Sequence, residues 1–297
     1  MPAKRRRAMV PWLFLAPFGV FFAVFFLAPI GYAIYQSLLT TKRTGAFGLG
    51  GSKTVFAGLD NFGAALGSTG FVESLGRVLL FAVVQVPVMI LLAIVLALLL
   101  DAASAKWPSF FRAAYFLPYG VPGVIATILW GFLYVPGMSP LIDLTSALGL
   151  EVDPLSSGAV LWSIANIVTW AFAGYNMLVI VAQLKSIPGE LYEAAIVDGA
   201  RPWQVIWHIK LPLIRPAIVL TTVFTIIGTL QLFAEPKVLR PLTAAIGVDY
   251  TPNLSAYTEA FQNNNYGLAA AEAVLLALGA FVLSFGFLHV VGRGGKR

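Results

Sequence analysis

The chain has 297 residues, of which 59% are hydrophobic and only 11% are charged, with a net charge of +6. These proportions exclude an ordinary soluble domain and predict an integral membrane protein. The absence of cysteine excludes a disulfide framework, a thiolate metal site and a cysteine nucleophile. The positive charge does not indicate nucleic acid binding, because the basic residues cluster beside apolar segments, as is typical of membrane orientation.

Six segments are apolar over the roughly 20 residues that a helix needs to cross the hydrocarbon core. Each is expected to be helical, because lipid offers backbone groups no hydrogen-bond partners. The first follows four basic residues, as a signal peptide does, but it is longer than a signal core and lacks a clear cleavage site, so we predict a retained helix. The sequence therefore predicts an all-α membrane protein with six transmembrane helices, at about residues 12–35, 78–100, 110–134, 158–183, 212–234 and 268–291.

Basic residues predict how these helices are oriented. Placing the N-terminus in the cytoplasm puts 13 of the 19 basic residues on that side, in agreement with the positive-inside rule. The loop 135–157 contains acidic residues and no basic residue, which independently indicates that it lies outside the cell. Both termini are therefore expected to be cytoplasmic, in a multi-pass protein of the cell membrane. The cytoplasmic set is Lys4, Arg5, Arg6, Arg7, Lys106, Arg112, Lys185, Arg201, Lys210, Arg215, Arg293, Lys296 and Arg297, and the external set is Lys42, Arg43, Lys53, Arg77, Lys237 and Arg240.

The external loops 35–77 and 235–267 carry the Gly, Pro and Asn residues that interrupt helices. One stretch, "GLGGSKT" from Gly48 to Thr54, imitates a phosphate-binding loop. It has Ser52 where the motif requires a glycine directly before the lysine, it follows no predicted strand, and it lies outside the cell. We interpret it as a flexible loop, and the sequence shows no zinc-protease motif or nucleophile elbow that would support catalysis by this chain alone.

Ionisable residues inside the predicted helices are scarce. Glu272 is the clearest, while Arg77 and Glu235 lie at external ends. Ion-coupled carriers generally place carboxylates, histidines or broken helices at mid-membrane. A lone Glu272 near an external end is more typical of a solvated boundary residue, which weakens the hypothesis of a secondary carrier without excluding it.

A charged stretch between the fourth and fifth predicted helices, residues 186–212, is the longest cytoplasmic loop. Pro188 suits the first turn of a helix, where the missing amide would have no intrahelical partner. Gly199 suits the left-handed residue that ends a helix, and Pro202 suits the start of another. We expect one short helix over about 188–198 and a second over about 202–210, with Pro212 closing the segment and opening the fifth membrane helix.

The surface of this loop has two interpretations. Trp203 and Trp207 suit an amphipathic helix at the level of the lipid headgroups. The acidic residues Glu190, Glu193 and Asp198 are poor partners for anionic lipid, and small alanines beside a turn permit close approach by another protein. The charges slightly favour a protein partner.

The loop resembles a known motif in residue type and spacing. Glu193, Ala194 and Ala195 are followed after three residues by Gly199, and nine residues later by Ile209, one further residue, Leu211 and Pro212. This is similar to the EAA motif, EAA-x3-G-x9-I-x-LP, of the membrane subunits of binding-protein-dependent ABC importers. "SIPGELYEAA" upstream and the "DGA" from Asp198 to Ala200 resemble the carbohydrate-importer branch.

The resemblance covers nearly the whole chain. Residues 12–38, 58–62 and 110–134 look like permeases similar to the maltose-system F subunit and the glycerol-3-phosphate-system A subunit. The chain departs from them in two external segments, having "RPLTAAIGVDYTPNL" where a glycine-rich "TGGGP"-like segment is usual and "GMSPL" where an asparagine is common. These departures concern docking detail and substrate class.

The resemblance implies a MetI-like permease fold, with a permease domain over 73–290 that contains the coupling loop 186–212. Residues 1–72 would hold a cytoplasmic tail, the first helix and an external loop, and 291–297 a second tail. It also implies a heterodimer with a second permease, two ATPase subunits that bind ATP and Mg, and an extracytoplasmic solute-binding protein, with no cofactor in this chain. The expected ATPase-coupling residues are Glu190, Glu193, Ala194, Ala195, Asp198, Gly199, Ile209, Leu211 and Pro212.

A path for sugar near mid-membrane would need hydrogen-bond partners and aromatic faces. Seven polar or aromatic residues in or directly beside the predicted helices are candidates for contact with the sugar. For each of them taken singly, we favour the alternative that its side chain forms a contact between helices. They are Gln85, Trp162, Asn166, Trp170, Asn176, Gln231 and Glu235.

The leading hypothesis is the membrane subunit of an ATP-driven sugar importer. One alternative keeps this architecture with another cargo, such as glycerol 3-phosphate or its diesters, polyamines or peptides. The absence of basic residues at mid-depth mildly favours a neutral sugar over an anion. The second alternative is a secondary carrier or channel that acts without ATP.

Overall fold

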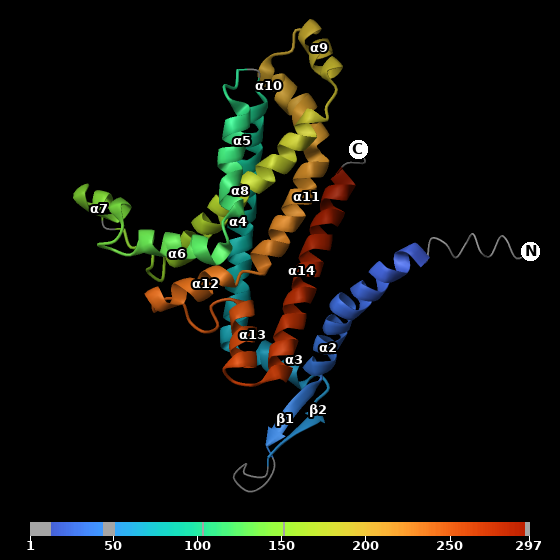
Figure 1. Ribbon diagram of the computed structural model, residues 1–297, viewed down its shortest axis with the longest axis vertical. Helices are drawn as coiled ribbons and strands as arrows, with labels where there is room; N and C mark the ends of the chain where they lie inside the picture. The colour runs from blue at the N-terminus through green and yellow to red at the C-terminus, as the bar shows by residue number, and fades with distance from the viewer. Residues whose placement is uncertain (1–12, 44–50, 103, 151, 295–297) are drawn as a thin grey trace, which may run out of the picture. The chain divides into compact units, whose positions relative to one another are not determined.

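The computed structural model describes residues 13–43, 51–102, 104–150 and 152–294 (Figure 1). The chain divides into two compact units, one of Met1–Val72 with Ser255–Ala277 and one of Glu73–Leu254 with Leu278–Arg297. The predicted cytoplasmic residues 4–7, 296 and 297 and the loop glycines at 48 and 50 lie outside the described residues.

The first unit begins with the helix Leu13–Ser37, which includes the π-helical η1 (Ala23–Leu27) and α2 (Ala28–Ser37). An antiparallel hairpin of β1 (Leu39–Arg43) and β2 (Ser52–Phe56) follows, and then α3 (Asp60–Gly67). The buried Asn61 of α3 donates 2.8 Å hydrogen bonds to the backbone oxygens of Ser37 and Leu39, fixing the end of α2 and the start of the hairpin.

The hairpin contradicts the expectation of a flexible loop at residues 48–54 in an all-α protein. Ser52, Lys53 and Thr54 of the loop that imitates a phosphate-binding motif lie in β2. The β-branched Thr40, Thr41, Thr54 and Val55 pair across the two strands, and such residues favour a pleated backbone. The polar composition of the two strands gave no alternation of apolar and polar residues from which the hairpin could be predicted.

The second unit contains a bundle of helices and their connections. α4 (Thr69–Asp101), α13 (Pro252–Phe261) and α14 (Tyr266–Gly294) pass between the units. The others are α5 (Pro108–Phe116), η3 (Leu117–Gly120), α6 (Gly123–Tyr134), α7 (Pro140–Ala147), α8 (Val160–Lys185), α9 (Gly189–Val197), α10 (Pro202–Val205), η4 (Ile206–Lys210), α11 (Leu211–Leu230), α12 (Ala234–Leu239) and η5 (Arg240–Leu242).

Five helices of the described chain are long and apolar enough to cross a membrane. Four of them contain almost all of the predicted first, second, fourth and sixth helices. They are Leu13–Ser37, Thr69–Asp101, Val160–Lys185 and Tyr266–Gly292. The fifth, Pro202–Leu242, contains the predicted fifth helix. A bent pair of helices brings the number to six if it is counted as one span.

This bent pair corrects the predicted third helix at 110–134. Pro108–Gly120 and Gly123–Tyr134 meet at 96°, so the segment is no continuous helix. Val121 has extended backbone angles (φ −82°, ψ 126°), which are typical of a residue that precedes a proline. Pro122 then caps α6, which lies beside α12 (Figure 1).

The fifth helix also differs from its prediction. α10, η4 and α11 form one helix from Pro202 to Leu230, so Pro212 does not close the segment. Pro212 cannot donate a backbone hydrogen bond within this helix, and the π-helical turn η4, where the hydrogen-bond pattern already departs from that of an α-helix, ends immediately before α11. The helix ends before the predicted boundary, because residues 231–233 are not helical.

Glu272 is a fourth correction. Its side chain is 2% exposed, and its neighbours Ala269 and Ala271 on α14 are buried as well. The prediction of a solvated boundary residue is therefore wrong: this part of α14 is packed inside the first unit.

Two apolar clusters hold the second unit together. One joins α4, α6, α8 and the segments after α11, and Ile164 and Leu239 are fully buried in it. The other joins α4, α8 and α11 through Ala97, Met177 and Ile214. Burying such side chains contributes about 25 cal/mol per Å² of apolar surface removed from water. The clusters fix the helices that carry the residues described below.

Gly174 permits a close contact between the backbones of two helices in this unit. A Cβ atom at this position of α8 would lie 1.8 Å from the backbone oxygen of Tyr115 in α5. We expect Gly174→Ala to lower the free energy of unfolding by about 1–3 kcal/mol, because two backbones must separate. Gly279→Ala in α14 is the matched control, since no heavy atom lies within 4 Å.

The measurement is the unfolding of both purified variants in detergent. The control should equal or exceed the parent in stability, because alanine favours helix over glycine by about 1 kcal/mol. Equal stability of the two variants would contradict the assigned contact.

Candidate functional site

The α9–α10 unit, residues 189–205, consists of two short helices joined by a tight turn at one end of the second unit (Figure 1). Gly199 has φ +74°, a left-handed value that is unfavourable for other residues. Its amide donates to the oxygen of Ile196 at 3.0 Å, and that of Ala200 donates to Ala195 at 2.9 Å. These bonds satisfy carbonyls at the end of α9, as expected for a glycine that ends a helix.

The surface of this unit combines acidic and apolar side chains, because Ile196 and Val197 of α9 are 69% and 86% exposed beside its acidic residues. Glu190, Glu193, Ala194 and Asp198 are exposed, whereas Ala195 is buried against the chain. Trp203 and Trp207 are 55% and 65% exposed. Ile209 and Leu211 are half-buried and Pro212 is exposed. The predicted ATPase-coupling residues on and just after α9 are therefore mostly exposed, whereas Ile209 and Leu211 near the start of α11 are half-buried.

Beneath α9, three polar residues from different elements meet. Lys210 at the end of η4 and Asp101 at the end of α4 form an ion pair, with Nζ and Oδ2 2.6 Å apart. The ammonium group also lies 5.3 Å from the ring centre of Tyr192 on α9. Burial, and to a lesser extent the Asp101 carboxylate, raise the pKa of the Tyr192 phenol, so the ring remains neutral at physiological pH.

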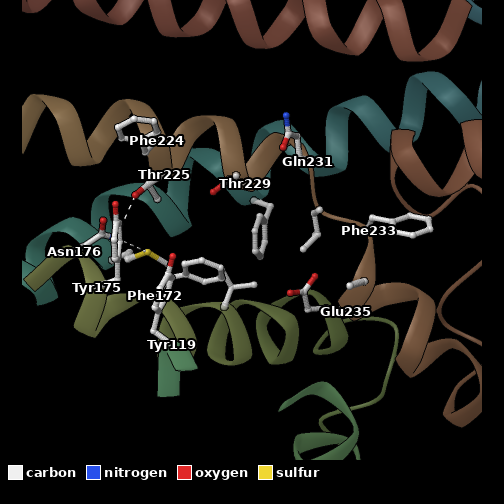
Figure 2. Close-up of a pocket in the computed structure, with 16 residues that line it drawn as sticks. Tyr119, Phe172, Tyr175, Asn176, Phe224, Thr225, Thr229, Gln231, Phe233 and Glu235 are labelled. Carbon is white, nitrogen blue, oxygen red and sulfur yellow. Dashed lines mark hydrogen bonds between the residues drawn. The ribbon is translucent and has the colours of Figure 1, made fainter. Parts of the chain in front are cut away.

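A cavity of about 570 Å³ lies between α4, η3, α8, α11 and the start of α12. Figure 2 shows Tyr119, Phe172 and Tyr175 on one side and Phe224, Thr225 and Thr229 of α11 on the other. Tyr119 stacks on Tyr175 with ring centres 4.8 Å apart and meets Phe172 edge-on at 5.7 Å. These aromatic faces can stack on a flat apolar face of a ligand.

Glu235, at the start of α12, lines this cavity and also a second one of about 340 Å³. Its carboxylate points toward the space between the two walls (Figure 2). Among the described residues, those that line the two cavities include no Lys, Arg or His. The site therefore offers hydrogen-bond acceptors, hydroxyl groups and aromatic rings, with one acidic group.

The seven predicted path residues separate into two groups. Asn176, Gln231 and Glu235 line the larger cavity. Asn176 also joins three helices, because its Nδ2 donates to Thr225 Oγ1 at 3.3 Å and to Met89 Sδ at 3.2 Å. The other four, Gln85, Trp162, Asn166 and Trp170, do not line either cavity.

The contacts of this second group lie mainly between helices. Gln85 Nε2 donates to Thr169 Oγ1 at 2.6 Å and to the oxygen of Ala165 at 3.2 Å, which joins α4 to α8. Asn166 donates to the hydroxyl of Tyr134 at 2.9 Å. Trp170 meets Trp130 edge-on, with ring centres 5.9 Å apart. Trp162 is 41% exposed.

The sequence analysis missed the aromatic wall of the cavity. Phe172 and Tyr175 are three residues apart on α8 and therefore share one face, a spacing that was visible in the sequence. Tyr119 comes from η3, whose position depends on the 96° bend, so no local pattern could place it there. In the described residues, no group of three or more Asp, Glu or His side chains could hold a metal ion.

Comparisons with known proteins give consistent matches. The family model described as "Binding-protein-dependent transport system inner membrane component" matches residues 61–293. The chain is 34% identical to the sn-glycerol-3-phosphate transport system permease protein UgpA of Agrobacterium fabrum, over 93% of this chain and 94% of the relative. It is 31% identical to the lactose transport system permease protein LacF of Rhizobium radiobacter, over 95% and 94%.

A solved structure has a similar fold. A chain of a bacterial ABC transporter involved in the import of the acidic polysaccharide alginate matches with a TM-score of 0.81 over 98% of both chains. The sequence identity is 23%, so this likeness concerns the fold alone.

A stability comparison distinguishes the two groups of polar residues. We expect Gln85→Met to lower the free energy of unfolding by about 1 kcal/mol, because it removes two hydrogen bonds between α4 and α8. Gln231→Met is the control at an exposed position of the cavity and should change stability by less than about 0.5 kcal/mol. Denaturant unfolding of both variants in detergent is the measurement, and an unchanged Gln85→Met would contradict the structural role.

Proposed function

The chain belongs to the family of binding-protein-dependent transport system inner membrane components, and we propose that it forms half of the translocation path of an ABC importer for a sugar or oligosaccharide. It is a multi-pass membrane protein with the MetI-like permease fold expected from its sequence. Its relatives are transport components rather than enzymes, so ATP hydrolysis is assigned to separate ATPase subunits that hold ATP and Mg.

Coupling to an ATPase is assigned to the α9–α10 unit. The observation that supports it is the outward position of Glu190, Glu193 and Ala194 on α9, directly before the turn at Gly199. An exposed helix of nine residues with acidic side chains suits a groove on a soluble protein better than an anionic lipid surface. The exposed Trp203 and Trp207 then lie at the boundary between the membrane and that partner.

The cargo site is assigned to the cavity that contains Glu235. Sugars present hydroxyl groups at their edges and apolar faces above and below the ring, which match a carboxylate, threonine hydroxyls and aromatic rings. The relative named for lactose supports this class of cargo. Specific recognition of the sugar belongs largely to the separate solute-binding protein.

The remaining parts follow from this assignment. A second permease would complete the path as a heterodimer, two ATPase subunits would bind from the cytoplasm, and the binding protein would dock outside. Six membrane helices, cytoplasmic termini and a cytoplasmic membrane location are part of the same proposal. The permease domain is proposed to occupy residues 73–290, with residues 186–212 as its coupling loop, and the family match extends over 61–293.

Glycerol 3-phosphate is the second candidate cargo, because the 34% identical relative is named for it. A phosphate group is usually bound by arginine, lysine or helix N-termini. The described residues that line the two cavities include no basic side chain, so we prefer a neutral polyhydroxylated cargo. A carrier that works without ATP would be indicated if uptake continued with an inactive ATPase partner.

Changes in the α9–α10 unit should uncouple hydrolysis from uptake. We expect Gly199→Pro or Glu193→Lys to leave the importer assembled but to reduce ATP-driven sugar uptake by about 10-fold or more, because proline cannot adopt φ +74° and lysine reverses the charge. Uptake and ATP hydrolysis are measured in vesicles that hold the complete importer. Gly279→Ala in α14, at an exposed residue with no heavy atom within 4 Å and outside the coupling loop, is the control. Normal uptake by both test variants would refute the coupling role.

Glu235 should control which cargo passes. We expect Glu235→Gln to reduce uptake of a neutral oligosaccharide by about 10-fold, since a hydrogen bond to a charged group contributes about 1.5–3 kcal/mol. Glu235→Lys should also raise uptake of glycerol 3-phosphate relative to the neutral sugar. Glu73→Gln removes an exposed carboxylate of α4 that lines neither cavity and should have no effect. Unchanged uptake ratios in both Glu235 variants would place the cargo elsewhere.

A further inference from the structure

The ion pair between Lys210 and Asp101 links elements that are far apart in the sequence. Both side chains are only 14% exposed, and the 2.6 Å separation is that of a short, charge-assisted hydrogen bond. Tyr192 covers the ammonium group, and the neighbouring Leu100 and Leu211 pack against the apolar cluster of α4, α8 and α11. Water therefore has little access, so the attraction between the two charges is screened less than it would be on an open surface.

The placement of Asp101 is unfavourable without its partner. It is the last residue of α4, where the partial negative charge of the helix end repels a carboxylate. A polar uncharged residue would end this helix more favourably. Lys210 offsets the cost, and it stands at the end of the π-helical turn η4. A π turn contains an additional residue relative to an α turn, so it rotates the residues around it, and such turns are frequent at functional positions.

Besides its link to α8 through residues 186–188, the α9–α10 unit has two connections into the membrane helices at its C-terminal end. One is covalent, because α10, η4 and α11 form a continuous helix. The other is the ion pair, which ties that helix to the end of α4. Both α4, through Phe81 and Met89, and α11, through Phe224, Thr225 and Thr229, line the cavity of about 570 Å³. The ion pair is the polar contact that ties the end of α4 directly to this helix, next to the apolar cluster that α4 and α11 share with α8.

We propose that the Lys210–Asp101 ion pair is a positioning contact that makes α4 move with the α9–α10 unit during transport. The proposal rests on the coupling function proposed above. Without the pair, ATP would still displace α9 and α11, but α4 would no longer follow them and the cavity would not change its access in step with hydrolysis.

The first experiment compares single and reversed charges in the complete importer in vesicles. Asp101→Asn and Lys210→Gln should each reduce the sugar transported per ATP hydrolysed by about 5-fold or more, the usual lower range of a coupling effect. Asp101→Lys combined with Lys210→Asp restores an ion pair and should recover at least part of the ratio, whereas each reversal alone should not. Lys210→Arg should retain most of the parent ratio.

Two controls separate coupling from folding and from general charge. Lys185→Gln removes an exposed lysine at the end of α8, on the same side of the membrane, and should transport like the parent. Assembly is checked by copurification of the ATPase subunits with each variant. Single variants that assemble and transport normally per ATP, or a reversed pair that assembles and remains as defective as the single variants, would overturn the proposal.

The second experiment observes the movement itself. The chain has no cysteine, so Leu99→Cys on α4 and Leu213→Cys on α11, both exposed positions, give two unique sites for spin labels. With the native pair, the distance between the labels should stay nearly constant when ATP binds. With Asp101→Asn it should change, because α11 moves without α4. An identical response in both backgrounds would overturn the proposal.

The outcome also distinguishes this proposal from the one on which it rests. If Gly199→Pro abolishes coupling and Asp101→Asn does not, the α9–α10 unit is the coupling element and the ion pair is dispensable. If Gly199→Pro and Glu193→Lys both transport normally, the coupling function itself is wrong.

Discussion

The constraint on which this structure depends is that lipid cannot hydrogen-bond to a peptide group. Long segments must satisfy their backbone internally, and α4, α8, α11 and α14 do so as helices. Irregular backbone is then confined to places where protein surrounds it or water reaches it. The breaks at residues 121–122 and 231–233 lie next to cavity-lining residues, and the turn at Gly199 lies at the exposed end of the second unit. These three interruptions of helical structure therefore lie at the cavities or at an exposed surface, where a ligand or a partner protein has access.

The same constraint explains how distant sites can be connected. A helix transmits displacement along its axis because each turn is bonded to the next, and the helix from Pro202 to Leu230 joins the α9–α10 unit to the threonines of the cavity. Lateral transmission needs contacts between helices. In the second unit these contacts are apolar clusters, the close approach at Gly174, and a few polar links such as Asn176 with Thr225.

Much of this was predictable from sequence, for identifiable reasons. Continuous apolar runs placed four membrane helices, and Gly199 with its flanking prolines placed the α9–α10 turn, because these signals are local. The 96° bend was missed, since the apolar composition of 110–134 continues through Val121 and Pro122. The hairpin was hidden by polar strands, and the burial of Glu272 by distant packing. Of the cavity, polar residues on α8 and α12 were found, but Tyr119 required the tertiary arrangement.

α4 has a further consequence through its length. Its 33 residues extend over about 50 Å at 1.5 Å per residue, whereas the hydrocarbon layer is about 30 Å thick. The difference must be taken up by tilt or by projection into the headgroups. Asp101, at one terminus, can thus lie at the depth of the lipid headgroups, outside the hydrocarbon layer. Packing against neighbouring helices sets the tilt of α4, and bilayer thickness then sets how far its ends project into the headgroup layers, so the surroundings of Asp101 depend on the lipid composition of the host membrane.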